Sequence, residues 1–294
     1  MRRITLDDRL FNIAITCFMI VLGLITAYPL IYIVSASFSS PQAVSAGKVV
    51  LWPVDISIEG YRAVFRDPNL LIGYRNTIFY TIAGTFINVS MTMAAAYPLS
   101  RRELVGRGIF LFLFSFTMLF NGGLIPNYML MNNLGLINTV WAMLLPGAIS
   151  IYNLFITRTF INSSIPYELW EASQIDGCSD FRYFFAILLP LSKPVIAVIA
   201  LYYAVGHWND YFNAFIYLTD RALFPLQLIL RDILISNKIN SSMIVDPELL
   251  EVQEGMADLL KYALIIVSSV PILCFYPLIQ RYFIQGVMIG SLKG

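Results

Sequence analysis

The stretch "EASQIDGCSDFRYFFAILLPLSKP", residues 171–194, is a charged segment in a chain whose longest segments are apolar. Its charged residues are Glu171, Asp176, Asp180, Arg182 and Lys193. The stretch lies between two long runs without Asp, Glu, Lys or Arg, residues 108–157 and 194–209. Because charged side chains are costly inside hydrocarbon, this pattern predicts a loop at the surface of a membrane protein.

The composition is that of a polytopic membrane protein, so the lipid bilayer is the first expected partner. Of the 294 residues, 58% are apolar and only 13% are charged, and the mean hydropathy is +0.72. Soluble domains are about 45–50% apolar and about 25% charged. The net charge of +1 gives no basic field that would attract nucleic acid. Cys17, Cys178 and Cys274 are too widely spaced for a disulfide framework or a zinc site, so we expect no metal.

Hydropathy predicts an all-α membrane protein with six transmembrane helices. A span needs about 20 mostly apolar residues. The uncharged run of residues 108–157 is too long for one span and divides at the polar turn "NNLGLIN", residues 132–138. The predicted spans are Leu10–Phe38, Asn76–Ser100, Gly108–Leu130, Thr139–Thr157, Pro194–Phe215 and Tyr262–Gln280.

The distribution of lysine and arginine predicts that both termini are cytoplasmic, because the shorter segments on that side carry more of these residues per unit length. The loop of residues 163–194 then faces the cytoplasm, and residues 217–260 form an outer segment. We divide the chain into residues 1–75, which hold the first span and the first outer segment, and residues 76–294, the core. A cleaved signal peptide is disfavoured because the first apolar run exceeds the usual length of about 7–15 residues.

The loop 163–194 has the pattern of two helices separated by a glycine. The expected signals, in chain order, are a cap at Ser164, a first-turn Pro166, an acidic Glu168, a terminating Gly177 and a second cap at Ser179 or Asp180. A loop that only connects two spans is the alternative, but it would need fewer residues.

Four stretches resemble the permease subunits of maltose-type carbohydrate ABC importers. "EASQIDG" followed by "ILLPLSKP" resembles their EAA loop, in which E-A-A is followed by a glycine and then I-x-L-P; Ser173 replaces the second alanine. The other stretches are "LGLINTVWAMLLPGAIS" (134–150), "HWNDYFNAFIYL" (207–218) and "RYFIQGVMIGSLKG" (281–294). "PLQLILRDIL" (225–234) is most similar to the subgroup that carries oligo- and polysaccharides.

This resemblance implies a type I ABC importer permease fold in the bacterial cytoplasmic membrane. It implies four kinds of partner contact: a second, different permease subunit, two ATP-binding cassette subunits, an extracytoplasmic sugar-binding protein and lipid. The EAA loop would be the coupling helix that docks on the ATPase. The residues it assigns to coupling are Glu171, Ala172, Ser173, Gly177, Leu189 and Pro190, to which we add Glu168 and Asp176 as polar contacts.

We expect the chain to be no enzyme. It has no G-x-x-x-x-G-K-[ST] phosphate loop, because Gly47-Lys48 lacks both the earlier glycine and the following serine or threonine. The resemblance therefore assigns ATP and Mg to the partner ATPase subunits, and we expect no cofactor here. His207 has no serine, cysteine or second carboxylate beside it in a catalytic spacing, so we predict no catalytic residue.

Polar and aromatic side chains near the spans are the candidates for a sugar path. They are Asn121, Asn127, Tyr128, Trp208, Asn209, Asp210, Tyr211 and Asn213, with Asn133 and Asn138 at the turn. Asp210 is the sharpest, because a charge at membrane depth is usually functional. Alternatively, Asp210 caps a helix or pairs with His207, the asparagines link helices, and the rings form an interfacial belt.

A self-contained ion-coupled transporter of a small polar solute is the alternative function. Such a protein needs intramembrane carboxylates to bind the coupling ion. Only Asp210 is available in the predicted spans, so the sequence disfavours this alternative.

Overall fold

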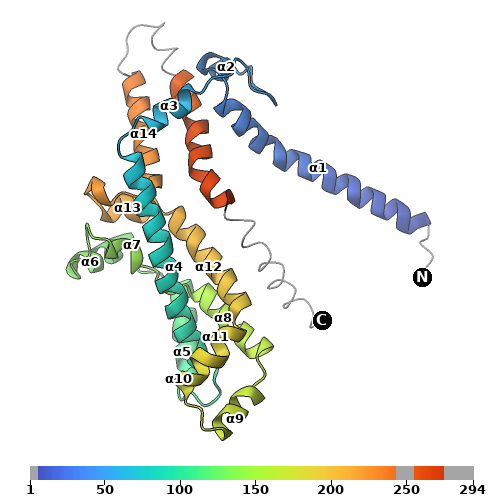
Figure 1. Ribbon diagram of the computed structural model, residues 1–294, viewed down its shortest axis with the longest axis vertical. Helices are drawn as coiled ribbons and strands as arrows, with labels where there is room; N and C mark the ends of the chain where they lie inside the picture. The colour runs from blue at the N-terminus through green and yellow to red at the C-terminus, as the bar shows by residue number, and fades with distance from the viewer. Residues whose placement is uncertain (1–5, 243–254, 275–294) are drawn as a thin grey trace. The chain divides into compact units, whose positions relative to one another are not determined.

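The structure is a computed structural model that describes residues 6–242 and 255–274, and every regular element within those ranges is helical (Figure 1). The chain divides into two compact units. Unit 1 comprises Met1–Pro68 and Leu230–Val270, and unit 2 comprises Asn69–Ile229 and Pro271–Gly294.

Unit 1 holds the first predicted span and a short helical cap. Its elements are α1 (Leu6–Ser37), α2 (Pro41–Ser45), α3 (Glu59–Phe65), the later part of α14 (Leu226–Ser242) and most of the helix Gly255–Cys274. Its buried cluster includes Ala43, Val49 and Leu259. Most of the apolar side chains along α1 are exposed, as expected of a helix that contacts lipid on several sides.

Unit 2 holds the remaining helices and contains residues 163–194, which we call the coupling loop after the role that the sequence resemblance implies. Its elements are α4 (Leu70–Ser100), α5 (Arg107–Leu119), α6 (Leu124–Asn133), α7 (Trp141–Leu144), α8 (Ile151–Ser164), α9 (Glu168–Ile175), α10 (Asp180–Tyr183), the π-helix η1 (Phe184–Leu188), α11 (Leu189–Leu191), α12 (Lys193–Trp208), α13 (Phe212–Tyr217), the 3₁₀ turn η2 (Arg221–Leu223) and the start of α14.

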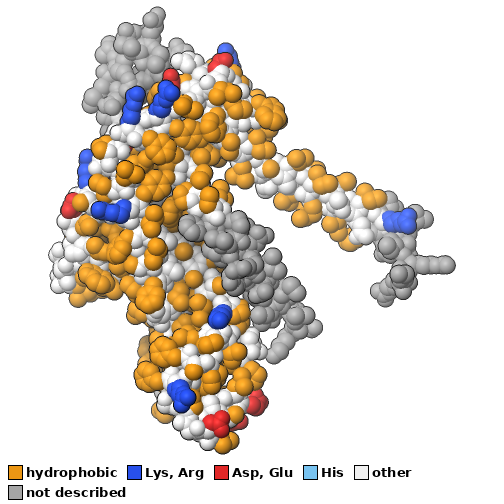
Figure 2. Space-filling view, viewed as in Figure 1, with side chains coloured by type: hydrophobic (Ala, Val, Ile, Leu, Met, Phe, Trp, Pro, Cys, Tyr) orange, Lys and Arg blue, Asp and Glu red, His pale blue; other side chains and the backbone are white. Residues whose placement is uncertain are grey.

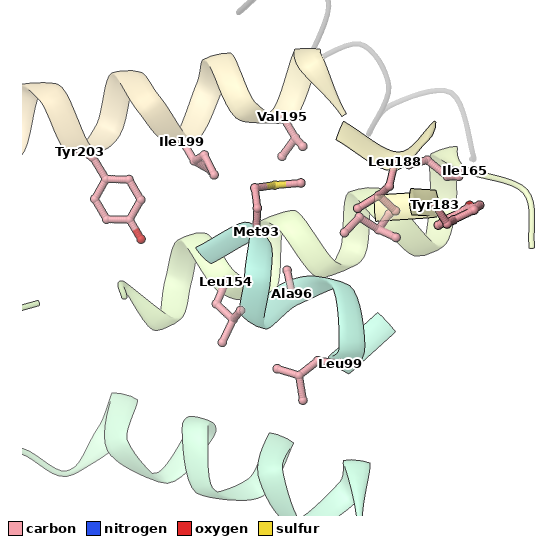
Figure 3. Packing of buried hydrophobic residues seen from close by; sticks show 11 residues of the cluster. Met93, Ala96, Leu99, Leu154, Ile165, Tyr183, Leu188, Val195, Ile199 and Tyr203 are labelled. Atoms are coloured by element: carbon pink, nitrogen blue, oxygen red, sulfur yellow. The ribbon is translucent and has the colours of Figure 1, made fainter. Parts of the chain in front are cut away.

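The core of unit 2 forms where α4 packs against α8 and α12 (Figure 1). Figure 3 shows Val195 and Ile199 of α12 lying over Met93 of α4, with Leu154 of α8 nearby. Ile165, Tyr183 and Leu188 of the coupling loop belong to the same buried cluster. The loop is therefore anchored in the packed core of the unit and is no loose connector.

Polar side chains also link these helices. Asn88 of α4 donates from Nδ2 to the carbonyl oxygens of Gly147 (3.1 Å) and Ala148 (2.9 Å), and its Oδ1 lies 2.7 Å from Nε2 of His207. Tyr203 of α12 bonds Thr92 of α4 at 2.7 Å. Interhelical hydrogen bonds and close packing drive association in membranes, where burial of apolar surface contributes little.

The span count of six is not confirmed among the described residues. Three helices are long and apolar enough to cross a membrane: Phe11–Ser37, Leu70–Ser100 and Gly255–Cys274. Two bent pairs raise the number to five if each pair is one span: Arg107–Leu119 with Leu124–Asn133, bent by 116°, and Asp180–Leu191 with Lys193–Trp208, bent by 79°. Residues 275–280 of the sixth prediction and the tail 281–294 lie outside the described residues.

The predicted fourth span, Thr139–Thr157, is wrong as a continuous helix. It contains the four-residue α7, a non-helical segment and only the first half of α8. Pro146 and Gly147 interrupt it, because Gly147 adopts a left-handed φ of 70°. Ser150 then caps α8 by accepting a hydrogen bond from the amide of Asn153.

The third predicted span, Gly108–Leu130, is also wrong as a continuous helix, because it breaks at residues 120–123 between α5 and α6, where Gly123 adopts a φ of 90°.

Two further boundaries differ from the sequence predictions. The fifth span was predicted to reach Phe215, but α12 ends at Trp208 and α13 begins at Phe212. Ser164 does not cap the coupling helix, because it is the last residue of α8, and α9 begins at Glu168 without a side-chain cap. Ile165 is buried in the segment between α8 and α9, and this packing positions the start of α9.

We predict that Gly84→Ala destabilises the protein. A Cβ at Gly84 of α4 would overlap the ring of His207, whose displacement would break the bond to Asn88. We expect a net loss of about 1–3 kcal/mol, as for an overpacked core, although alanine favours helix by about 1 kcal/mol. The measurement is the free energy of unfolding in detergent.

Gly206→Ala in α12 is the matched control, because no atom lies within 4 Å of its added Cβ. Equal or greater stability of Gly84→Ala relative to this control would contradict the close approach of α4 and α12.

Candidate functional site

The first helix of the coupling loop, α9, carries four of the eight coupling residues predicted from the sequence. Glu168, Glu171 and Ala172 are exposed on α9, whereas Ser173 is buried and donates a 2.7 Å hydrogen bond to the carbonyl of Trp170. Ser173 thus serves packing within the loop. The exposed acidic side chains form a surface that a basic partner can contact.

The turn after α9 has the predicted conformation. Gly177 adopts a φ of 71°, the left-handed region that glycine favours, and ends the helix after the exposed Asp176. Ser179 caps α10 by accepting a 3.3 Å hydrogen bond from the amide of Arg182, so Ser179, and not Asp180, is the second cap. Leu189 and Pro190 lie in α11 at the start of the return to α12, Leu189 half-buried and Pro190 exposed.

The outer face of the loop also exposes large apolar side chains. Ile175, at the end of α9, is 87% exposed, and Phe181, in α10, is 80% exposed. Figure 2 shows acidic side chains gathered at the end of unit 2 that α9 forms. Sequence reasoning looked for charge and missed these residues, although large apolar side chains inside a charged stretch were a usable signal. Apolar anchors surrounded by charge are typical of protein-protein contacts.

Aromatic contacts to Arg101 hold the loop against the end of α4. The guanidinium carbon lies 4.6 Å from the ring centre of Tyr97, 4.8 Å from that of Tyr183 and 5.2 Å from that of Trp170. Asp180 accepts hydrogen bonds from the Tyr97 hydroxyl and from Trp170 Nε1, both at 3.2 Å. Arg101 therefore links α4 with both helices of the loop, a contact that the sequence analysis did not identify.

A second link joins the segment after α4 to the entry of α9. The Tyr167 hydroxyl donates a short hydrogen bond to Glu103, and the guanidinium of Arg102 lies 5.2 Å from the Tyr167 ring centre. The Tyr167 hydrogen bond holds the pKa of Glu103 below its ordinary value of 4.5, with a smaller contribution from the amide of Glu103 itself. The bond to Tyr167 thus favours the ionised carboxylate.

The sugar-path candidates separate into two groups. Asn121 accepts a 2.9 Å hydrogen bond from the amide of Gly123 at the bend between α5 and α6, so it shapes the bend. Asn127, Tyr128 and Asn133 lie on α6 and are exposed. Tyr128 stacks on Tyr217 of α13 with ring centres 6.3 Å apart.

Asn138 connects the same two regions through the backbone. Its Oδ1 accepts from the amides of Thr219 (3.0 Å) and Asp220 (2.8 Å), and its own amide donates to the carbonyl of Tyr217 at 2.7 Å. Asn138 therefore links two parts of the chain, as in the alternative in which the asparagines connect helices and do not bind sugar. Tyr217, which the sequence analysis passed over, is the meeting point of α6, the turn and α13.

The second group surrounds the junction of α12 and α13. Asp210 accepts hydrogen bonds from the amide (3.2 Å) and the Nδ2 (2.8 Å) of Asn213, so it holds the start of α13. The ring of His207 bonds Asn88, and in the described residues Asp210 bonds His207 only through the backbone, from its amide to the His207 carbonyl at 3.3 Å. Trp208 is buried.

Two candidates of this group remain accessible. Asn209 donates from Nδ2 to the carbonyl of Val205 at 2.9 Å and is exposed, and Tyr211 is 45% exposed. Asn121, Asn127, Tyr128, Asn133 and Asn138 of the first group are exposed as well. In the part of the chain that the structure describes, no group of three or more His, Cys, Asp or Glu could hold a metal ion.

We predict that Tyr167→Phe raises the pKa of Glu103 toward 4.5, because the phenylalanine cannot donate the hydrogen bond. In the unmodified protein this contact is complete above pH 4.5 and is lost as the pH falls through the lowered pKa of Glu103. The measurement is a carbon-13 NMR titration of the Glu103 carboxyl in detergent.

Tyr152→Phe is the control, because Tyr152 is an exposed tyrosine of α8 that makes no hydrogen bond to Glu103. An unchanged Glu103 titration in Tyr167→Phe would show that the hydrogen bond does not form in solution.

Comparisons with known proteins agree with this architecture. Residues 70–289 match the family model described as "Binding-protein-dependent transport system inner membrane component". The chain is 40% identical over 98% of its length to the polygalacturonan/rhamnogalacturonan transport system permease protein YtcP of Bacillus subtilis (strain 168), all of which is covered. It is 39% identical to protein LplC of the same organism, over 99% of this chain and 97% of LplC.

A solved structure matches almost the whole chain. It is the crystal structure of a bacterial ABC transporter involved in the import of the acidic polysaccharide alginate. One chain of it is 33% identical, with a TM-score of 0.83, and the match covers 96% of this chain and 100% of that one. The packed helices of unit 2, the anchored loop and these matches together show that the chain belongs to the inner-membrane permease family of binding-protein-dependent ABC transporters.

Proposed function

We propose that this chain forms half of the translocation pore of an ATP-driven, binding-protein-dependent importer of an oligo- or polysaccharide. The observation that carries the proposal is the surface of the coupling loop. It combines exposed acidic residues with the exposed Ile175 and Phe181, on a loop whose inner face is anchored in the helical core. A loop that only connects two spans is not expected to expose large apolar side chains, because exposed apolar patches mark interaction sites.

The assembly that we propose has four further components. They are a second, different permease subunit, two ATP-binding cassette subunits and an extracytoplasmic sugar-binding protein. ATP and Mg are bound by the cassette subunits. We propose six spans in the type I arrangement with both termini cytoplasmic, so that the coupling loop faces those subunits.

In the proposed cycle, ATP closes the cassette pair and moves the coupling loop. Because Arg101, Tyr183 and Trp170 join the loop to α4, the loop and the packed helices would move together as a rigid body. Glu171, Asp176, Ile175 and Phe181 would contact the cassette subunit.

The substrate class is supported by the relatives. The names of YtcP and of the matched alginate transporter both concern polysaccharides. Among the exposed path candidates, Asn127, Tyr128, Asn209 and Tyr211 provide amides and rings, which suit sugar hydroxyls and the faces of pyranose rings. The ion-coupled alternative loses support, because both oxygens of Asp210 are engaged by Asn213 at the start of α13.

We predict that Gly177→Leu releases the ATPase. Leucine in the left-handed conformation costs about 1–2 kcal/mol, and its side chain would project toward the docking partner, since no atom of this chain lies within 4 Å of the added Cβ. We expect at least tenfold less ATPase to co-purify with the tagged chain from native membranes.

Gly135→Leu is the matched control, because Gly135 has a φ of 67° and is equally open but lies in the turn after α6. Gly177→Asn separates backbone strain from the effect of an added side chain, since asparagine tolerates the left-handed conformation. Purification of the unmodified chain without an ATPase, with transport driven by an ion gradient in vesicles lacking ATP, would disprove the proposed function.

A further inference from the structure

A pocket beside the coupling loop has features that coupling does not explain. Its volume is about 570 Å³, and it lies between the end of α4, the link from α4 to α5, the end of α8 and the start of α9. Ligand pockets of small molecules usually measure about 300–1,000 Å³. The pocket therefore has room for a group larger than a few waters.

The wall of this pocket is strongly cationic. The charged side chains that line it are Arg101, Arg102, Arg107, Arg158 and Glu168. Four arginines against one glutamate leave an excess of three positive charges. Arg101, Arg107 and Arg158 are half-buried, so the mutual repulsion of their charges is less screened than it would be in water.

None of these arginines forms an ion pair with a carboxylate within 4 Å in the described ranges, although Glu103 and Asp180 lie on the far sides of residues next to Arg101. The ion pairs found there, Arg231 with Asp232 and Lys261 with Asp258, do not involve the pocket. Neutral carbonyl oxygens hold two of the arginines in place: Arg107 donates to the carbonyl of Arg101 (3.2 Å), and Arg158 donates to that of Leu99 (2.9 Å). The backbone thus fixes their orientation without cancelling their charge.

Arg101 adds donors that have no acceptor. Its Nε and Nη2 are buried and make no hydrogen bond, although aromatic rings flank the guanidinium. A buried unsatisfied donor needs an explanation such as a bound ion, because most buried polar groups are paired. Cationic walls, fixed guanidinium groups and unsatisfied donors are together the features of an anion site.

The guanidinium fork suits one kind of anion best. Arginine binds phosphate and carboxylate through two parallel hydrogen bonds, and several arginines converge where the ligand carries more than one charge. Basic pockets at the cytoplasmic ends of transmembrane helices also bind anionic lipid headgroups. This pocket begins at Ser100, the last residue of the long apolar helix α4, which is such a position.

We propose that this pocket binds a phosphate group, carried either by an anionic phospholipid or by a free phosphate ion. The bound group bridges the α4–α5 link, α8 and the start of the coupling loop, and so braces the loop on its frame. The lipid source rests on the proposed topology, which puts the pocket at the inner leaflet. The chemistry of the pocket does not depend on that topology.

The test uses the complex purified through a tag on this chain, delipidated in a neutral detergent. The probes are dioctanoyl phosphatidylglycerol, with zwitterionic dioctanoyl phosphatidylcholine as its control, and inorganic phosphate against chloride at equal ionic strength. The readout is hydrogen exchange of peptides that cover residues 97–110 and 155–170, which reports this pocket and not nucleotide sites on other subunits. We expect saturable protection of both peptides.

The combined substitution Arg107→Gln with Arg158→Gln should raise the apparent dissociation constant at least tenfold. Arg102→Gln, at the exposed rim, should raise the apparent dissociation constant by a smaller factor. This variant replaces the double variant in the test if the double variant does not fold. Arg221→Gln removes the same charge from an exposed turn elsewhere in unit 2 and should leave binding unchanged.

Protection by phosphatidylglycerol alone identifies a lipid site, and protection by both probes shows that a free phosphate group suffices. Protection by neither probe, or equal protection in wild type and in the arginine variants, overturns the proposal. If neither probe protects and the double variant sheds the ATPase, the pocket receives an acidic protein side chain and the proposal is wrong. Since probe binding requires no transport, its failure is distinguishable from failure of the proposed function.

Discussion

The packing of α4 against α8 and α12 is the constraint on which the rest of unit 2 depends. In a bilayer, apolar surface gains little by leaving lipid, so helices associate through close contact and hydrogen bonds between them. Gly84 lets the ring of His207 reach Asn88, and Asn88 in turn binds the non-helical backbone at Gly147. Without the close approach of α4 and α12 at Gly84, both α12 and the interrupted fourth span would lose their contacts with Asn88.

The contacts of the coupling loop extend this packing beyond the apolar core. Arg101 follows directly after the last residue of α4, and its guanidinium lies among Tyr97, Trp170 and Tyr183. Ile165 and Leu188 anchor the same loop from the apolar side. A force applied to the outer face of α9 would therefore reach α4 through packed side chains, as a rigid-body mechanism requires.

Much of this organisation could be predicted from the sequence. Hydropathy identified α1, α4 and α12, because long uncharged runs have few structural alternatives. The glycine at 177 identified the turn of the coupling loop, because a left-handed φ is costly for other residues. The fourth span was predicted wrongly, because hydropathy measures apolarity and does not register that Pro146 and Gly147 interrupt the helix.

The candidate site also has features that the sequence predicts and features that only the structure reveals. The sequence by itself determined the membrane class, the family resemblance and the position of the coupling loop, since these depend on local composition, spacing and motif. Only the tertiary structure decided which distant side chains meet: that His207 pairs with Asn88, and that arginines from three segments line one pocket. The physical reason is that such contacts join residues up to 119 positions apart, and helix packing alone determines which of them are adjacent.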